Sequence, residues 1–165
     1  MLNDKLQIQL KHYIIDGNNL IGKDKILNQI QKKNKQQSRE KLSFMLSRYF
    51  SSTKSSVSLH FDGFEKESVK TSNLKIIYSN NSSADNKIKS EIEKSKNPRN
   101  IILITSDNNL IEFGRVCSCK VIRSEDFTYQ LKQANEDFED QIKTGTNLNV
   151  EEYKKLFGVN SSDND

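Results

Sequence analysis

Four aspartates stand where parallel α/β proteins place side chains that do chemistry, at the exits of apolar runs or at the start of a helix. Asp16 and Asp62 each end an apolar run and are followed by glycine, and Asp107 follows the run 101–104. Asp85 opens a helical pattern. Ligands in open α/β sheets bind just outside the carboxyl ends of strands, so these acids are candidates for a shared site.

Carboxylates brought together favour a metal ion, because like charges repel and a divalent cation between them relieves the repulsion. No cysteine or histidine stands at these strand ends, and the hard oxygen ligands favour Mg²⁺ or Mn²⁺ over zinc. Such an ion polarises a phosphoryl oxygen and lowers the pKa of a bound water. With no Cys/His pair, serine elbow or glycine-rich phosphate loop, the pattern indicates phosphodiester hydrolysis.

Each acid also has a structural explanation. Asp16 and Asp107 could cap the helices that follow them, and Asp62 before Gly63 could be a turn residue. Ser82 and Asp85 have nearly the spacing of a capping box. Any one acid leaves the choice open, and their joint placement favours the metal site.

The elements that must position these acids alternate between short apolar runs and helical patterns. Strands are expected near residues 13–15, 57–61, 74–79, 101–104 and 121–122, and helices at 21–30, 42–50, from 84 to Pro98, at 110–114 and at 124–142. A helical turn is expected at 151–157. This alternation predicts a three-layer α/β/α sandwich around a mainly parallel sheet of about five strands. Right-handed connections then bring the strand ends that carry acids to one side of the sheet.

The charge balance favours a polyanionic partner. The 165 residues suit a single domain, and their net charge is +4 although the last five residues carry two acids. The basic residues crowd between positions 23 and 41. Either a solvated helix face or contact with a nucleic acid would explain them.

Nothing in the sequence indicates a membrane span or a secretion signal, so a cytoplasmic location is expected. Cys117 and Cys119 stand two residues apart without nearby histidines. They are expected to be reduced thiols, one of them facing the core, rather than a zinc site.

The order of the motifs resembles the NYN-domain branch of the PIN-like nucleases, and within it the YacP-like ribonucleases. The resemblance covers about residues 10–132 and rests on the segments 13–20, 57–63, 83–85 and 104–107. It implies a PIN-type, Rossmann-like sheet and metal-dependent RNA cleavage. It assigns the metal to Asp16, Asp85 and Asp107, and the shaping of the site to Asn19. Asp62 matches the acid of the second strand, whose role is less defined.

One departure concerns Asn108 and Asn109, which stand where many PIN-like nucleases have a further acid. The expected protein is therefore a cytoplasmic endoribonuclease with Mg²⁺ or Mn²⁺, acting on mRNA or at the ribosome, with one domain at 1–158 and a disordered tail at 159–165. Its expected catalytic residues are Asp16, Asn19, Asp62, Asp85 and Asp107, and its expected RNA-binding residues are Lys23, Lys25, Lys33, Arg39, Lys87, Lys89 and Arg99.

Two other functions remain open at this point. The first is an RNA- or ribosome-binding module of the same fold that performs no chemistry. The second is a phosphatase or DNA nuclease, because the same acids serve any phosphate ester. The oligomeric state is left open.

Overall fold

Five short strands form one parallel sheet, in the order β3-β2-β1-β4-β5, in the computed structural model, which describes residues 10–144. Every pairing between neighbouring strands is parallel. The strands are β1 (His12–Asp16), β2 (Ser56–Phe61), β3 (Lys75–Tyr78), β4 (Ile101–Ile104) and β5 (Lys120–Ile122). The mainly parallel sheet of about five strands predicted from the sequence is confirmed.

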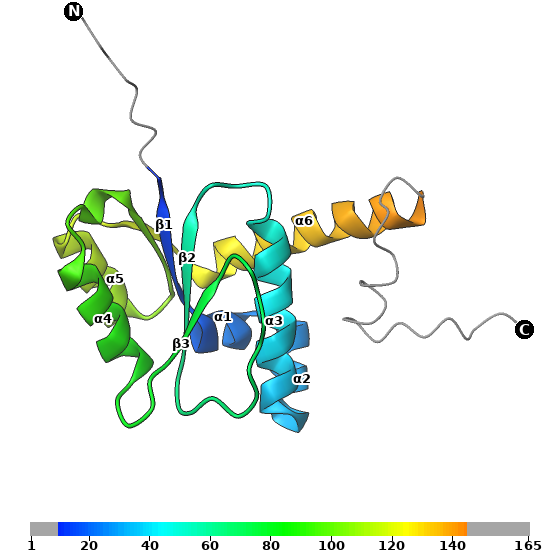
Figure 1. Ribbon diagram of the computed structural model, residues 1–165, viewed down its shortest axis with the longest axis horizontal. Helices are drawn as coiled ribbons and strands as arrows, with labels where there is room; N and C mark the ends of the chain where they lie inside the picture. Colours follow the sequence, from blue (N-terminus) through cyan, green and yellow to red (C-terminus); the bar gives the residue numbers. More distant parts are fainter. Residues whose placement is uncertain (1–9, 145–165) are drawn as a thin grey trace, which may run out of the picture.

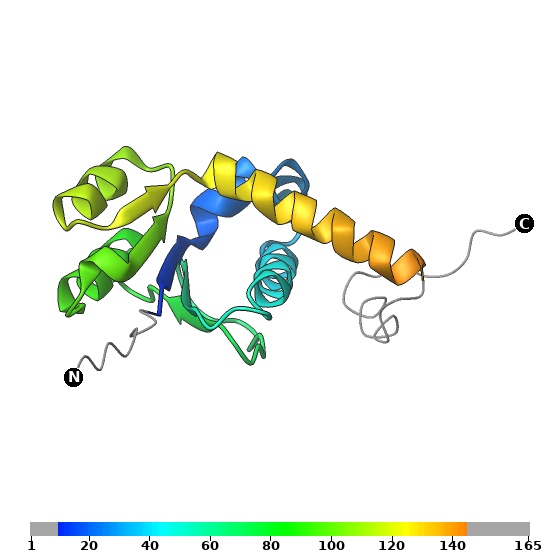
Figure 2. The same cartoon turned by 90° about the horizontal axis from the view of Figure 1, so that it is seen from above.

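Helices cover both faces of the sheet and make the expected three layers (Figures 1 and 2). Each face has its own core: one contains Ile15, Leu42 and Phe127, and the other contains Ile14, Ile88 and Leu110. The face with α4 (Ala84–Lys94) and α5 (Asn108–Val116) lies opposite the face with α1 (Gly17–Lys23), α2 (Lys25–Lys33), α3 (Lys35–Tyr49) and α6 (Ser124–Lys143). A 3-10 turn, η1 (Pro98–Asn100), leads into β4.

The single helix expected near residues 21–30 is in fact two helices, because Asp24 interrupts it. The Asp24 carboxylate accepts hydrogen bonds from the backbone N–H groups of Ile26 and Leu27, both at 2.9 Å, and so caps α2. The Lys/Gln-rich segment 31–37 is helical on both sides of Asn34, which ends α2 and caps α3 by accepting from the Gln37 N–H at 3.1 Å.

The chain changes direction across the sheet beside β1. It builds β2 and β3 on one side of β1 and then returns to place β4 and β5 on the other side. The carboxyl ends of β1 and β4 therefore flank the topological switch point, where α/β folds bind their ligands. Asp16 ends β1, and Thr105 directly follows β4.

The remaining expectations about the chain have mixed outcomes. Cys117 and Cys119 are free thiols, and Cys119 is buried in the core under α5, as predicted. The helical turn expected at 151–157 and the tail at 159–165 lie outside the described residues. In the range 10–144, no helix has both the length and the apolar character that crossing a bilayer requires.

Candidate active site

Asp16 lies at the switch point with only 5% of its surface exposed. One oxygen of the Asp16 carboxylate accepts a hydrogen bond from the Asn19 N–H at 3.3 Å and so caps α1. The other oxygen accepts from the Thr105 hydroxyl at 3.0 Å. Gly17 is required by close packing: a Cβ there would lie 2.5 Å from the Phe61 ring and 2.8 Å from the His60 carbonyl oxygen. The packing of β1 against β2 thus fixes where the Asp16 carboxylate stands.

The pKa of Asp16 is raised to about 6, chiefly because burial disfavours the charged form. Its hydrogen bonds from Asn19 and Thr105 act in the opposite direction, and the negative charges of Asp85 and Asp62 raise the pKa further. These three acids, all singled out in the sequence, therefore lie within electrostatic reach of one another.

Asp85 lies at the first turn of α4 and is half-buried. Ser83, not Ser82, caps this helix by accepting from the Asn86 N–H at 3.1 Å, so the capping box considered for Ser82 and Asp85 does not form. Burial raises the pKa of Asp85, and the charges of Asp107 and Asp62 add to the effect. Its carboxylate is thus the one acid of the four without a capping role.

Asp62 is exposed and connects two helices to the end of β2. Its carboxylate accepts from the Ala84 N–H at 2.8 Å, at the start of α4, and its own N–H donates to the Asn18 side chain at 3.0 Å. It is therefore more than the turn residue considered from the sequence.

Asp107 caps α5 by accepting from the Leu110 N–H at 2.9 Å. Its own N–H donates to the Thr105 hydroxyl at 3.1 Å, and that hydroxyl donates in turn to Asp16. Thr105, which is fully buried, connects the two acids and was not singled out from the sequence. The capping roles proposed for Asp16 and Asp107 are thus present, and they leave lone pairs on both carboxylates for other ligands.

Asn19 joins three elements at the same edge. Its side-chain oxygen accepts from the Ser106 N–H at 2.8 Å and from the Ser124 hydroxyl at 2.7 Å. Ser106 also accepts from the Ser124 N–H at 2.9 Å and donates to Glu125, whose carboxylate lies 3.4 Å from the Lys23 amine. Asn19 thereby holds the β4–α5 turn and the start of α6 beside Asp16.

The chemistry of these donors suits Mg²⁺, because the four side chains offer hard oxygen ligands and mutual repulsion that a cation would relieve. Their positions do not yet form a coordination group: among the described residues, no three Asp, Glu, His or Cys side chains are arranged to hold a metal ion. The carboxylates share one edge of the sheet, and several of their oxygens bind backbone N–H groups instead.

Several of the expected RNA-binding residues are accessible. Lys23, Lys25, Lys33 and Lys87 are exposed on α1, α2 and α4. Lys89 is partly buried, with its amine 5.5 Å from the centroid of the Phe113 ring.

Arg39 does not match its expected role. Only 4% of it is exposed, and its guanidinium donates to the carbonyl oxygens of Asp62 and Phe64 while lying over the rings of Phe61 and Tyr78. Arg39 therefore holds the loop that carries Asp62 and is not available to an RNA backbone.

Arg99 is exposed, but the fold separates it from the acids. It belongs to η1, which immediately precedes β4, so it lies at the amino edge of the parallel sheet. The acids lie at the opposite edge. The expectation that Arg99 contributes to the same site is corrected by this topology.

A polar cluster on the α4 side of the sheet was not predicted. Glu91 accepts from His12 at 2.7 Å and from Ser58 at 2.6 Å through one oxygen, and from His60 at 2.5 Å through the other. Burial would raise the pKa of Glu91, but these three hydrogen bonds outweigh burial and lower it. The period-two alternation of strands does place Ser58 and His60 on one face, which was the only available signal in the sequence.

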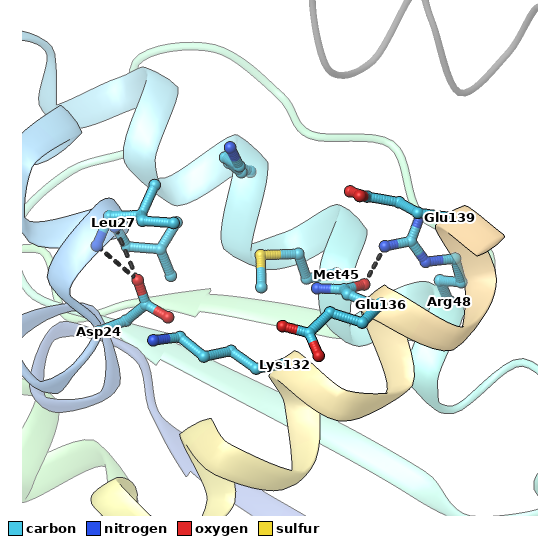
Figure 3. A pocket seen from close by; sticks show the side chains of 10 residues that line it. Asp24, Leu27, Met45, Arg48, Lys132, Glu136 and Glu139 are labelled. Atoms are coloured by element: carbon cyan, nitrogen blue, oxygen red, sulfur yellow. Dashed lines mark hydrogen bonds between the residues drawn. The ribbon is translucent and has the colours of Figure 1, made fainter. Parts of the chain in front are cut away.

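A hollow of about 320 Å³ lies away from the strand ends, between α2, α3 and α6 (Figure 3). Its walls carry both signs of charge, including Asp24, Lys132 and Glu136. Every residue that lines it comes from a helix or a helix cap, and none is a predicted site residue. We therefore assign the candidate active site to the carboxyl edge of the sheet.

Comparison with known proteins agrees with the fold. A profile of the YacP-like NYN domain matches residues 13–158. The crystal structure of a mutant of Rae1 (YacP) from Bacillus subtilis is similar with a TM-score of 0.69 and 18% identity, over 89% of this chain and 91% of that chain. A second crystal structure of Rae1 (YacP) from the same organism gives a TM-score of 0.67 and 22% identity, over 83% and 82% of the two chains.

No curated protein matches the sequence. The family profile covers most of the chain, and its family belongs to a nuclease-like superfamily. The structures at this level of identity support the PIN-like fold. The chain belongs to the family of YacP-like NYN domains.

Proposed function

We propose that the protein is a metal-dependent endoribonuclease that hydrolyses RNA phosphodiester bonds at the carboxyl edge of its sheet. The observation that carries the proposal is the gathering of Asp16, Asp62, Asp85 and Asp107 at that edge, with the pKa of both Asp16 and Asp85 raised partly by neighbouring carboxylates. A fold has little reason to hold uncompensated negative charges together unless a cation or a reaction uses them.

In this proposal Asp16, Asp85 and Asp107 would hold Mg²⁺ or Mn²⁺, which when bound polarises a phosphoryl oxygen and favours ionisation of a water. Asn19 keeps the β4–α5 turn and α6 in place around these acids through its contacts with Ser106 and Ser124. Asp62 positions the first turn of α4, which carries Asp85.

The exposed amines of Lys23, Lys25, Lys33 and Lys87, with the partly buried Lys89, would bind the RNA backbone. Such contacts release counterions, so affinity should fall as salt rises. Arg39 and Arg99 have no part in this set, because one is buried and the other lies at the opposite edge of the sheet.

The direct test is cleavage of a labelled RNA by the wild type with Mg²⁺ and with EDTA, and by the variant Asp16→Asn with Mg²⁺. A matched control is Asp24→Asn, since Asp24 is also a buried helix-capping aspartate, with 3% of its surface exposed, but lies outside the acid group. We expect EDTA and Asp16→Asn to abolish cleavage and Asp24→Asn to retain it. Equal cleavage by Asp16→Asn and the wild type would refute the proposal. Parallel reactions with DNA and with a mononucleotide distinguish a ribonuclease from a DNA nuclease and from a phosphatase.

A non-catalytic RNA- or ribosome-binding module is the second candidate, favoured by the capping roles of Asp16 and Asp107 and by the lack of a preformed metal group within residues 10–144. Calorimetry separates the two. A nuclease should bind Mg²⁺ or Mn²⁺ in a manner that Asp16→Asn and Asp107→Asn weaken, whereas a pure binder should take up no such metal. Comparing free RNA with ribosome-bound RNA then tests whether the ribosome is a partner.

A further inference from the structure

A second hollow, of about 420 Å³, lies between the edge strand β3 and helix α4, on the face of the sheet that carries the Glu91 cluster. We define this basic hollow by the lysines Lys75, Lys87 and Lys94 together with His12, His60 and Glu91. Three amines against one carboxylate give it a positive excess. Such a lining favours an anionic ligand.

The positive excess is not neutralised by ion pairs within residues 10–144. Both oxygens of Glu91 are already occupied by His12, Ser58 and His60. Among the ion pairs of residues 10–144, none includes Lys75, Lys87 or Lys94. The three amines therefore have donors to offer to a ligand.

One ring nitrogen of a buried histidine in the wall of the hollow also lacks a partner. His60 is 1% exposed, its Nε2 binds Glu91, and its Nδ1 is buried without a hydrogen bond in the described structure. A buried polar atom is ordinarily satisfied by the protein, by water or by a ligand. His60 thus places an unsatisfied polar atom in the same wall that carries the lysines.

Two elements link the candidate active site to the basic hollow, which reaches the amino ends of β1 and β3 at His12 and Lys75. His60 is paired in register with Asp16 between β2 and β1. Helix α4 carries Asp85 and Lys87 in its first turn, and Glu91 and Lys94 in its later turns. Glu91 stands six positions after Asp85 on the helix, a rise of about 9 Å.

We propose that the basic hollow binds a backbone phosphate of the same RNA chain that is cut at the carboxyl edge, and so sets the direction in which the RNA leaves that edge. The lysines contact the phosphate, while the Glu91 cluster keeps His60 in place beneath it. The inference rests on the proposed function, and its test uses binding without cleavage, so that each can fail separately.

The first measurement is the affinity of the full chain for a single-stranded RNA in EDTA, at several salt concentrations. The double variant Lys75→Gln/Lys94→Gln removes two amines from the hollow, and Lys54→Gln/Lys120→Gln removes two exposed amines elsewhere. Each lost phosphate contact should lower the slope of log affinity against log salt by about 0.7. We expect the hollow variant to lose about fivefold in affinity and the control variant to keep the wild-type slope. Equal slopes for the two variants would overturn the proposal.

The second measurement uses the histidines themselves. The chain has two histidines, and both belong to this cluster. Their imidazole signals in the NMR spectrum of the wild type should shift when RNA is added. The shift should be smaller in Lys75→Gln/Lys94→Gln. In Lys54→Gln/Lys120→Gln it should be as large as in the wild type. Signals that move with inorganic phosphate but not with RNA would assign the hollow to a free anion and overturn the proposed RNA path. Signals that move with neither would also overturn it.

Discussion

Asp16 accepts a hydrogen bond from the Thr105 hydroxyl at 3.0 Å across the boundary between β1 and β4, where the strand order reverses. A buried carboxylate at the switch point is thus held by a neutral donor and by a backbone N–H group, and it belongs to none of the ion pairs of residues 10–144. Burial outweighs these two bonds and raises the pKa of Asp16 to about 6. Holding this acid in its charged form therefore makes the metal-free protein less stable.

Asp16→Asn should increase the free energy of unfolding of the metal-free protein. The folded pKa of about 6 exceeds the ordinary value of 3.8, so the folded state binds more protons, and stability falls as pH rises from about 4 to 6. The full destabilisation, of about 3 kcal/mol, is present above this window. An asparagine keeps the cap without the charge. Urea unfolding in EDTA at pH 7.5 should show a gain of about 1–3 kcal/mol, which shrinks at pH 4.

Asp24→Asn is the control for this measurement, because it removes charge from a buried cap that accepts two backbone hydrogen bonds. Charge-assisted bonds are stronger than neutral ones, so this variant should gain no stability. A stability of Asp16→Asn below that of the wild type at pH 7.5 would contradict the account of Asp16.

Mg²⁺ should stabilise the wild type at pH 7.5 and much less at pH 5. A ligand that binds only the folded state raises the free energy of unfolding, by about 2.7 kcal/mol at one hundred times its Kd. Below pH 6 Asp16 is largely protonated and a protonated carboxyl is a poor metal ligand. Thermal unfolding with and without Mg²⁺ measures the effect. An equal increase in Tm in Asp16→Asn would place the ion elsewhere.

The acids could be predicted from sequence because the strand period, the right-handed connections and the motif order all bring them to one edge. Arg39 was misplaced although its spacing contained the answer: it stands three residues before Leu42 and shares that residue's buried face of α3. The Glu91 cluster could not be found in this way. His12 and Ser58 are far apart in the chain, and the register that brings both to Glu91 follows from packing rather than from local pattern.

Arg39→Gln should destabilise the protein without changing the salt dependence of RNA binding. It removes donors to the carbonyl oxygens of Asp62 and Phe64 and contacts with two aromatic rings, a loss of about 2 kcal/mol. Lys33→Gln removes the same charge from an exposed position and should change stability by less than about 0.5 kcal/mol. Urea unfolding and RNA affinity at several salt concentrations measure both. A lower salt slope in Arg39→Gln than in the wild type would restore Arg39 to the RNA interface.

Asn19→Ala should lower both stability and RNA cleavage. The Ser106 N–H and the Ser124 hydroxyl would lose their common acceptor, and an unmet buried donor destabilises by about 1–3 kcal/mol. Asn19→Asp keeps an acceptor oxygen at that position, so it should recover most of the stability lost in Asn19→Ala. Denaturant unfolding of the two variants makes the comparison. If both variants were equally destabilised, the shared acceptor would not be what holds the β4–α5 turn and α6 together.

Glu91→Gln should lower stability at neutral pH and flatten its dependence on pH in acid. Hydrogen bonds from His12, His60 and Ser58 overcome the effect of burial and depress the pKa of Glu91 below its ordinary value of 4.5. The folded state then binds fewer protons than the unfolded state, so this stabilisation is present above pH 4.5 and is lost as pH falls below it. The sign is opposite to that of Asp16. Glutamine can accept at one oxygen only, and we expect a loss of about 2 kcal/mol at pH 7. Urea unfolding from pH 3 to pH 7 should therefore show the difference in free energy of unfolding between the wild type and Glu91→Gln shrinking in acid. A difference that stays constant over this range would mean that the stability of the cluster does not depend on the Glu91 charge.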